Sequence, residues 1–344
     1  MAGLVAAARA RELGASPIVF EKGSRAGGSM VLSSGVVWRF RTLEEFRAEC
    51  PDGDERLQRV VTERLDDALE WLESLGAPVV ARETGNPRTL GRRFETRGLT
   101  DALVRAAGEV HLETPFPSDA EPPLVLATGG FSVRYARRRG LLVRSNPWSE
   151  GDGFDYARAR GAASSDGMDE FYGRNMPAPP ARFGEDEFVQ LAQLYGRWAR
   201  IVNERGEEFF REAPSWSEND LVQATARQPG ATAWYLVPRA KLGEPTPYGT
   251  IAEVIERVRV AGGTVEDRGD GIAVHVMAAV THTIGGLRIN ERAQVVDGRG
   301  EPIEGLYAAG ADAGGISTGG YASGLAAALV FGRIAAENAI AEQR

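Results

Sequence analysis

The chain has 344 residues, of which 43% are hydrophobic and 26% charged, a balance that is typical of folded globular proteins and excludes a disordered chain. The net charge of −8 argues against a nucleic-acid partner, because binding to phosphates needs a concentrated positive surface. The only cysteine, Cys50, excludes an intrachain disulfide and a thiolate metal site, and we expect a cytoplasmic location.

The first predicted element is a helix over residues 2–13, where apolar side chains recur at a helical period and Gly14 provides a stop. Residues 16–20 are a short apolar run that indicates a buried parallel strand. Helix, tight turn, strand and the acidic Glu21 then form half of a βαβ unit. A long helix is predicted over residues 54–75, because leucine and valine return there every three or four positions.

The middle of the chain changes in composition. A helix over residues 99–107 and a buried strand over residues 124–128, which leads into Gly129 and Gly130, continue the first pattern. From residue 169 to residue 270, tryptophan, proline and glutamate become frequent, and helix and strand signals are mixed. We therefore expect an inserted second domain in this region.

The C-terminal part returns to the first pattern. It has a strand over residues 305–310, a glycine-rich loop over residues 314–324 and an alanine-rich helix over residues 325–341. No apolar run approaches the roughly 18 to 20 residues of a membrane span, and the N-terminus has no signal pattern, so we expect no membrane span.

Two N-terminal features could hold a nucleotide cofactor. Glu21 follows the second strand of the βαβ unit, where a carboxylate can accept both ribose hydroxyls of an adenosine. A surface glutamate is an equally good interpretation, and the position does not separate NAD from FAD. Residues 25–35 are rich in glycine and serine, so that backbone N–H groups could approach a diphosphate and a flavin ring. A plain glycine-rich turn is the alternative.

The C-terminal segment carries the strongest signal. A strand ends at Gly310, Asp312 follows, and a glycine-rich loop opens a helix at Leu325. Such a helix would direct its free N–H groups at a negatively charged ligand. A helix packed on a sheet through alanine and glycine would explain part of this loop, but not the whole sequence of strand, loop and helix.

Taken in order, these motifs resemble the fumarate reductase, succinate dehydrogenase and 3-ketosteroid dehydrogenase flavoprotein family. The segments that carry the resemblance are residues 21–23, 27–29, 127–131, 151–153, 282–287 and 305–310. The resemblance implies an α/β fold: a Rossmann-type FAD-binding domain over residues 1–168 and 276–344, interrupted by a smaller α+β cap domain over residues 169–275. It also implies that catalysis takes place where the cap closes over the flavin.

On this resemblance the cofactor is FAD and the partner is a small-molecule substrate, with an electron acceptor that stays open. Glu21 would hold the adenosine ribose, Asp312 would lie near the ribityl chain, and Ser323 would lie against the pyrimidine ring. The full set of expected cofactor-binding residues is Gly3, Glu21, Lys22, Gly27, Gly28, Ser29, Ser34, Gly35, Ala127, Thr128, Gly129, Asp152, Gly310, Asp312, Ser323 and Leu325.

Three residues are candidates for the chemistry. On the resemblance, His282 would lie in the substrate pocket and stabilise enolate-like charge; the alternative is a histidine that anchors the chain where it leaves the cap. Tyr321 could hydrogen-bond a carbonyl or simply pack. Arg239 could act as a cationic acid or substrate clamp, although a surface arginine is the simpler interpretation. We find no metal-ligand spacing.

The predicted function is an FAD-dependent oxidoreductase that acts on a CH–CH bond next to an activating carbonyl. A C4-dicarboxylate substrate is disfavoured, because residues 319–323 lack the family's carboxylate-binding arginine and Glu208 stands where a basic residue is usual. The alternatives are an FAD oxidase, an NAD-dependent dehydrogenase and a cofactor-free, non-catalytic remnant.

One part of the family pattern is not found. The first strand and first two glycines should precede Gly3, so that residues 1–3 supply only the end of the glycine-rich motif. Because those glycines admit the pyrophosphate, we expect this chain to bind FAD weakly or to fold poorly, and we suspect a start codon assigned too far downstream.

Overall fold

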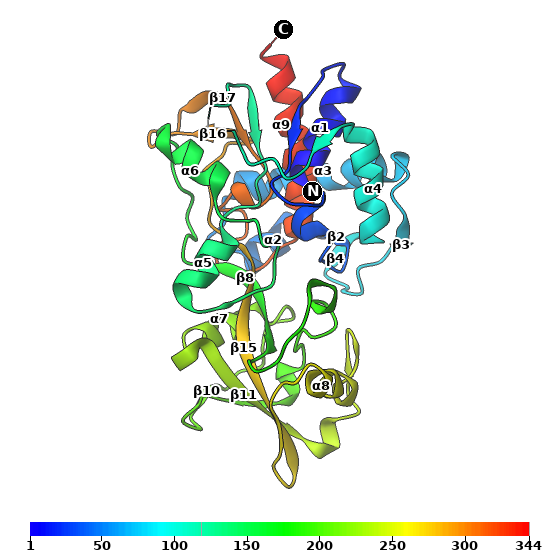
Figure 1. The fold of residues 1–344 in the computed structure, drawn as a ribbon, viewed down its shortest axis with the longest axis vertical. Helices are drawn as coiled ribbons and strands as arrows, with labels where there is room; N and C mark the ends of the chain where they lie inside the picture. The colour runs from blue at the N-terminus through cyan, green and yellow to red at the C-terminus, as the bar shows by residue number, and fades with distance from the viewer. Residues whose placement is uncertain (118, 344) are drawn as a thin grey trace. The chain divides into compact units, whose positions relative to one another are not determined.

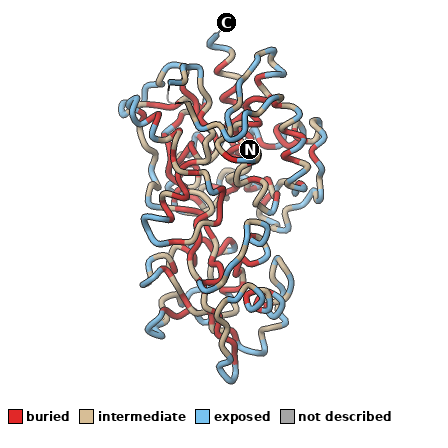
Figure 2. The backbone as a smooth tube through the Cα atoms, in the orientation of Figure 1, coloured by how far each residue is buried: buried red, intermediate tan, exposed pale blue. Residues whose placement is uncertain are grey.

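The computed structural model describes residues 1–117 and 119–343, and it divides the chain into two compact units (Figure 1). Unit 1 comprises residues 1–132, 146–170 and 282–344, and unit 2 comprises residues 133–145 and 171–281. Each unit buries its own apolar cluster, and Figure 2 colours the buried residues of the chain red. Each unit is therefore described by itself.

The borders differ from the expected ones at residues 168 and 275. Unit 2 consists of two segments, Val133–Ser145 and Phe171–Thr281. The first of them was expected in the first domain. The physical reason is strand pairing: β7 (Leu142–Val143) lies parallel to the long strand β15 (Gly271–Thr283). The main-chain hydrogen bonds of the sheet therefore bind this segment to unit 2.

Unit 1 combines helices with three small sheets. Its helices are α1 (Ala2–Glu12), α2 (Leu43–Glu49), α3 (Glu55–Ser74), α4 (Thr96–Ala107), α6 (Asp152–Ala159) and α9 (Gly324–Ala341), with 3-10 turns η1 (Gly28–Met30) and η6 (Gly310–Asp312). Its strands are β1 (Val19–Phe20), β2 (Val36–Phe40), β3 (Val79–Ala81), β4 (Thr89–Phe94), β5 (Val110–His111), β6 (Leu124–Leu126), β16 (Gln294–Val296) and β17 (Pro302–Ala308).

The sheets of unit 1 show mixed strand directions. β1 pairs in parallel with β5, and β17 pairs in parallel with β6 and antiparallel with β16. β2, β4 and β3 form an antiparallel sheet in the order β2–β4–β3. The predicted βαβ half-unit is present, because α1 leads through a short turn into β1.

α1 and α9 pack side by side in the core of unit 1 (Figure 1). The close approach depends on Gly332, since a Cβ there would lie 2.9 Å from the carbonyl oxygen of Ala2. α9 is also long and apolar enough for a membrane span by length and composition, with a mean hydropathy of 1.3, which the sequence analysis did not anticipate. Since 61% of it is buried inside unit 1, it serves as a core helix of this structure.

The predicted long helix corresponds to α3. Asp54 caps its N-terminus by accepting the backbone N–H groups of Arg56 and Leu57, and its leucine and valine stripe is buried. The predicted burial of residues 16–20 is wrong: Ile18 is 69% and Phe20 46% exposed. The reason is that Val19 and Val110 of this two-stranded sheet pack on the core, whereas Ile18 and Phe20 lie on the opposite face.

Unit 2 is built on one seven-stranded sheet. The strands β10 (Glu208–Phe210), β9 (Arg200–Val202), β11 (Thr232–Pro238), β15 and β14 (Val265–Asp267) follow one another across it, and β7 and β8 (Phe171–Pro177) also pair with β15. A separate hairpin joins β12 (Pro245–Thr246) to β13 (Gly249–Thr250). The helices are α5 (Ser132–Arg139), α7 (Asn219–Ala226) and α8 (Ile251–Val260), with short 3-10 turns η2 (Glu185–Glu187), η3 (Gly196–Trp198), η4 (Pro229–Ala231) and η5 (Arg239–Lys241).

Candidate functional site

The end of β6 and the turn after β17 meet at a buried carboxylate. Asp312 is fully buried and accepts hydrogen bonds from the Thr128 hydroxyl and the Gly129 backbone N–H, both at 2.9 Å. Burial raises the pKa of Asp312 above its ordinary value, while these hydrogen bonds act in the opposite direction. The Thr128 hydroxyl also accepts the N–H of Gly153 at 3.2 Å. These hydrogen bonds therefore join three of the expected cofactor-binding segments, at Thr128, Gly153 and Asp312.

A second contact adds the N-terminal segment to this group. Lys22 forms an ion pair with Asp152 at 3.0 Å, at the start of α6. The carboxylate of Glu21 accepts the N–H of Gly23 at 2.8 Å, which holds the side chain close to the turn that follows β1. The structure therefore brings Lys22, Asp152, Thr128 and Asp312 close together, and their contact with a shared ligand stays a prediction.

The glycine-rich turn at residues 27–30 lies beside two buried polar groups. Gly27 and Gly28 adopt positive φ angles of 101° and 54°, which favour glycine. The Ser29 hydroxyl accepts the backbone N–H of Asn146 at 2.9 Å. The side-chain oxygens of Asn146 and Ser149 are buried without a hydrogen-bond partner among the described residues.

These unsatisfied groups fit FAD, because a buried acceptor or hydroxyl without a partner is costly unless a ligand or water binds it. A Cβ on Gly129 would lie 2.7 Å from Ser149 Oγ, and one on Gly28 would lie 3.6 Å from Asn146 Nδ2. Glycines therefore keep open the space in front of both side chains. The sequence analysis missed Asn146 and Ser149, although they stand shortly before the Gly151–Gly153 motif that it used.

Most of the remaining expected cofactor residues are glycines that allow neighbouring backbone segments to approach one another closely. Gly3 lies in α1, where a Cβ would contact the Cβ of Ala127 at 3.4 Å, and a Cβ on Gly310 would lie 3.1 Å from that of Ala2. Gly35 lies against β4, where a Cβ would reach the carbonyl oxygen of Phe94, and Ser34 is exposed. These positions allow α1, β6 and η6 to approach one another.

His282 lies at the N-terminus of α9. A Cβ on Gly324 would be 3.0 Å from the imidazole Cε1, so the ring faces the first turn of the helix. Ser323 caps this helix through its hydroxyl, which accepts the N–H of Ala326 at 3.2 Å, and Leu325 packs on the core of unit 1. Burial lowers the pKa of His282 to about 4, because the charged imidazolium is poorly solvated there. His282 is therefore neutral at pH 7.

Tyr321 lies three residues before Gly324, in the loop that leads into α9. Its ring makes an edge contact with Trp38, with 5.6 Å between the ring centroids. Gly320 allows the loop to touch the end of α2, because a Cβ there would collide with the carbonyl oxygen of Glu49. His282 and Tyr321, which were predicted separately, thus approach the same end of α9.

Arg239 belongs to unit 2 and is exposed. Its guanidinium forms an ion pair with Asp267 and donates to the carbonyl oxygen of Gly269. The three groups hold η5 to the turn between β14 and β15. Its expected part in the chemistry stays a prediction.

Unit 2 contains a buried carboxyl that the sequence analysis did not find. Glu218 is 7% exposed, adopts a positive φ of 52° before α7 and accepts the N–H of Gly196 at 3.1 Å. Burial raises its pKa to about 7, and the hydrogen bond from Gly196 and the charge of Arg174 oppose this shift. No local pattern distinguishes Glu218 from its exposed acidic neighbours.

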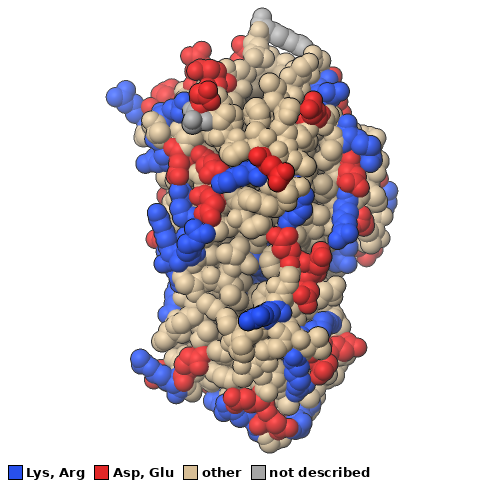
Figure 3. Space-filling view, viewed as in Figure 1, with Lys and Arg blue, Asp and Glu red and all other residues tan. Residues whose placement is uncertain are grey.

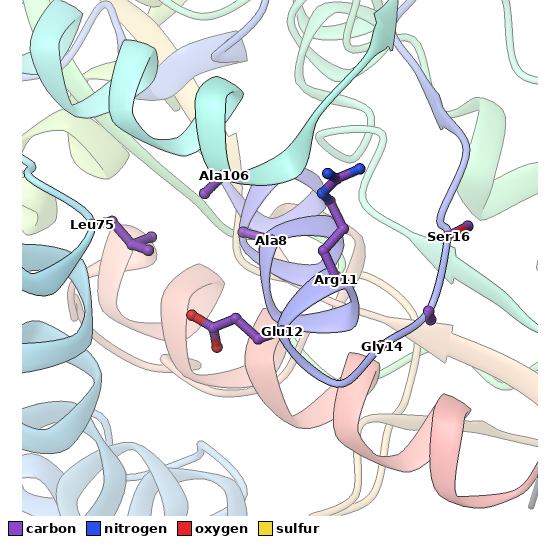
Figure 4. Close-up of a pocket in the computed structure, with 8 residues that line it drawn as sticks. Ala8, Arg11, Glu12, Gly14, Ser16, Leu75 and Ala106 are labelled. Atoms are coloured by element: carbon purple, nitrogen blue, oxygen red, sulfur yellow. The ribbon is translucent and has the colours of Figure 1, made fainter.

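A cavity of about 450 Å³ opens at the C-terminal end of α1 (Figure 4). Ala8, Arg11 and Glu12 of α1 line it together with Leu75 and Ala106, and Arg11 points toward the end of α4. None of the expected site residues lines this cavity. Acidic and basic side chains are interspersed on the face that Figure 3 shows, and no cluster of three or more His, Cys, Asp and Glu residues that could hold a metal occurs among residues 1–117 and 119–343.

Comparison with known proteins gives one family. The profile of the FAD binding domain matches residues 1–115 and 111–325. The probable fumarate reductase Ifc3 of Shewanella frigidimarina is 26% identical, over 98% of this chain and 73% of the relative.

Solved structures agree on the fold. The 3-ketosteroid-Δ4-(5α)-dehydrogenase of Rhodococcus jostii RHA1 superposes with a TM-score of 0.71 at 19% identity, covering 98% of this chain and 94% of the other. The 3-ketosteroid Δ1-dehydrogenase of Sterolibacterium denitrificans gives a TM-score of 0.72 at 18% identity, covering 99% and 98%. The match of the FAD binding domain profile to residues 1–115 and 111–325 shows that the chain belongs to this family, as an FAD-dependent oxidoreductase.

Proposed function

We propose that this oxidoreductase acts on a carbon–carbon bond next to an activating carbonyl. Bound FAD supplies the hydride chemistry at flavin N5. The observation that carries the proposal is the position of His282 against the first turn of α9, at the end of the helix that stabilises negative charge. Dehydrogenation of such a bond removes a hydride from one carbon and a proton from the carbon beside the carbonyl, and reduction reverses both steps.

The chain's own contribution is to stabilise the carbonyl oxygen while it gains negative charge. A neutral imidazole keeps one N–H, which His282 can donate to that oxygen. The Tyr321 hydroxyl, carried by the loop beside it, is the second donor in this proposal. Arg239 keeps its predicted role as acid or clamp from unit 2.

The surroundings of the loop support a substrate that is uncharged near Tyr321. A Cβ on Gly319 would lie 2.8 Å from Asp52 Oδ2, and the Gly319 N–H is bonded to the carboxylate of Glu170. A substrate carboxylate brought to this loop would meet two negative charges and no guanidinium from the loop itself. We therefore favour a ketone over a dicarboxylate, in agreement with the absence of arginine from residues 319–323.

The first test is the visible spectrum of the purified chain before and after incubation with FAD and desalting. Because the first two glycines of the family motif are not found, FAD is expected to bind weakly, so only part of the flavin spectrum should remain after desalting and the later steps use FAD in excess. The reduced enzyme would then be mixed anaerobically with 4-androstene-3,17-dione, 1,4-androstadiene-3,17-dione, acrylate and fumarate, and flavin reoxidation followed. Faster reoxidation by a ketone than by fumarate supports the proposal. Faster reoxidation by fumarate would contradict the substrate class, and a chain that binds no FAD would contradict the function.

The cytoplasmic location is part of the same proposal, and the electron acceptor stays open. A cytoplasmic location rests on the single cysteine, which is buried in the structure. Subcellular fractionation of the producing organism, followed by immunodetection, tests it directly.

A further inference from the structure

The loop between η6 and α9 has several anchors, and one of them is the N–H of Gly315, which donates to the carbonyl oxygen of Ile284 at 3.1 Å. At its start, the Asp54 N–H donates to the carbonyl oxygen of Gly315 at 2.8 Å, and Gln58 Nε2 donates to that of Ile316 at 3.0 Å. Near its end, the loop packs against the thiol of Cys50, because a Cβ on Gly320 would lie 3.1 Å from Cys50 Sγ. The anchor at the tip is Glu170, whose carboxylate accepts the N–H of Gly319 at 2.8 Å.

Glu170 differs from the other anchors in what else it binds. Its own carbonyl oxygen accepts the N–H of Ile284 at 3.0 Å, two residues after His282. Asp54, Gln58 and Cys50 all come from residues 50–58, far from residues 282–284 in the sequence. Glu170 therefore links the tip of the Tyr321 loop with the segment that carries His282, through its side chain and its main chain respectively.

The geometry at Gly319 shows how closely the loop tip is packed. Gly319 has a positive φ of 82°, and a Cβ on it would lie 2.8 Å from Asp52 Oδ2 and 3.3 Å from Pro51 Cδ. A charge-assisted bond from a backbone N–H to a carboxylate is shorter and stronger than a neutral one. Without it, the Gly319 N–H would turn to water, and the loop would keep only its bond from Gly315 to Ile284, four residues before the tip.

We propose that Glu170 is a positioning residue, which holds the loop tip at Gly319 so that Tyr321 and His282 keep a fixed relation to each other. The role of Glu170 in catalysis rests on the function proposed above, whereas its hydrogen bond to the Gly319 N–H does not. Loss of the carboxylate leaves the other anchors in place, so the variant is expected to fold.

Hydrogen–deuterium exchange of the full chain tests the anchor without any substrate. In Glu170→Ala, the peptide that covers residues 317–321 should exchange roughly fivefold faster, as expected for the loss of one ordinary hydrogen bond. Glu170→Gln should restore the slow exchange, because its amide oxygen can accept the same N–H. The matched control is Asp166→Ala, which removes an exposed carboxylate four residues earlier and should exchange like the parent chain.

Kinetics test the positioning role. With the substrate that reoxidises the flavin fastest, Glu170→Ala should lower kcat about tenfold with KM nearly unchanged, since a small misplacement of a donor affects mainly the reacting geometry. Glu170→Gln should recover most of this loss. Unchanged exchange of residues 317–321 in Glu170→Ala, or a Gln variant as impaired as the Ala variant, would overturn the inference. If the parent chain shows no turnover but the exchange pattern holds, the proposed function fails and the anchor stands.

Discussion

Two buried titratable side chains, Glu218 in unit 2 and His282 in unit 1, illustrate how burial alone sets the charge of a residue. Each is largely removed from water, and in each the burial cost is the largest cause of the pKa shift. The shifts favour the neutral form in both cases, which raises the pKa of the acid and lowers that of the base. The consequences for stability and activity can be measured separately.

Glu218 should make the protein less stable as the pH rises. Its folded-state pKa of about 7 lies above the ordinary value of 4.5, so the folded state holds a proton that the unfolded state has lost. Stability is therefore fully present below pH 4.5 and decreases as the pH rises to about 7, by about 3 kcal/mol at most. Glu218→Gln should remove this decrease, as measured by urea unfolding at pH 5 and pH 8.

The matched control for that measurement is Glu212→Gln, an exposed glutamate six residues earlier. It should unfold like the parent chain at both pH values. A Glu218→Gln variant that loses more stability at pH 8 than at pH 5 would show that the ionised carboxylate is stabilising, which contradicts this account.

His282 should stay neutral throughout the pH range in which the enzyme is assayed. Because its pKa is about 4, protonation of this ring should cause no decline in kcat between pH 7 and pH 5. His282→Ala should lower kcat/KM by about 100-fold, the lower end of the usual effect of removing such a group, while FAD is retained. An inflection in kcat near pH 6.5 that disappears in His282→Ala would contradict the neutral state.

At the scale of elements, the sequence predicts the helices better than the strands. α1, α3 and α9 were predicted within a few residues, because each carries a long apolar period and a capping signal at Gly14, Asp54 or Ser323. The sheet β2–β4–β3 was not predicted, since its strands are short and their pairing joins residues far apart in the chain.

The same distinction holds for the site. The glycine motifs are local and were found from the sequence, whereas Asn146, Ser149 and Glu170 act through contacts with distant segments. Their importance depends on burial and on the partner that the fold supplies. No spacing within the chain encodes either property, so these three residues could be identified only in the structure.

The N-terminal cap of α3 offers a test at this scale. Asp54 accepts two N–H groups of the first turn, and its own N–H holds the Tyr321 loop at Gly315. Asp54→Ala should cost about 1 kcal/mol in the free energy of unfolding, whereas Asp54→Asn should cost only a few tenths, because asparagine caps almost as well. Urea unfolding at pH 7 measures both. Equal losses in the two variants would show that the charge, and not the cap, stabilises the helix.

At the scale of the whole molecule, every expected cofactor residue lies in unit 1, although these residues extend from Gly3 to Leu325 in the sequence. Unit 2 has its own core and its own sheet. The insertion of unit 2 within unit 1 therefore leaves all the expected cofactor residues in unit 1. This separation predicts that the two units respond differently to the cofactor.

FAD should stabilise unit 1 directly. A ligand that binds only the folded state adds about 2.7 kcal/mol to its stability at 100 times its Kd. In hydrogen–deuterium exchange with and without FAD, peptides covering residues 21–35, 127–130 and 310–325 should become strongly protected. Peptides of β11 and α8, in the core of unit 2, should change little, and the exposed α1 end near Arg11 provides a control within unit 1. Equal protection of β11 and the glycine turn would show that cofactor binding and folding of unit 2 are one cooperative event.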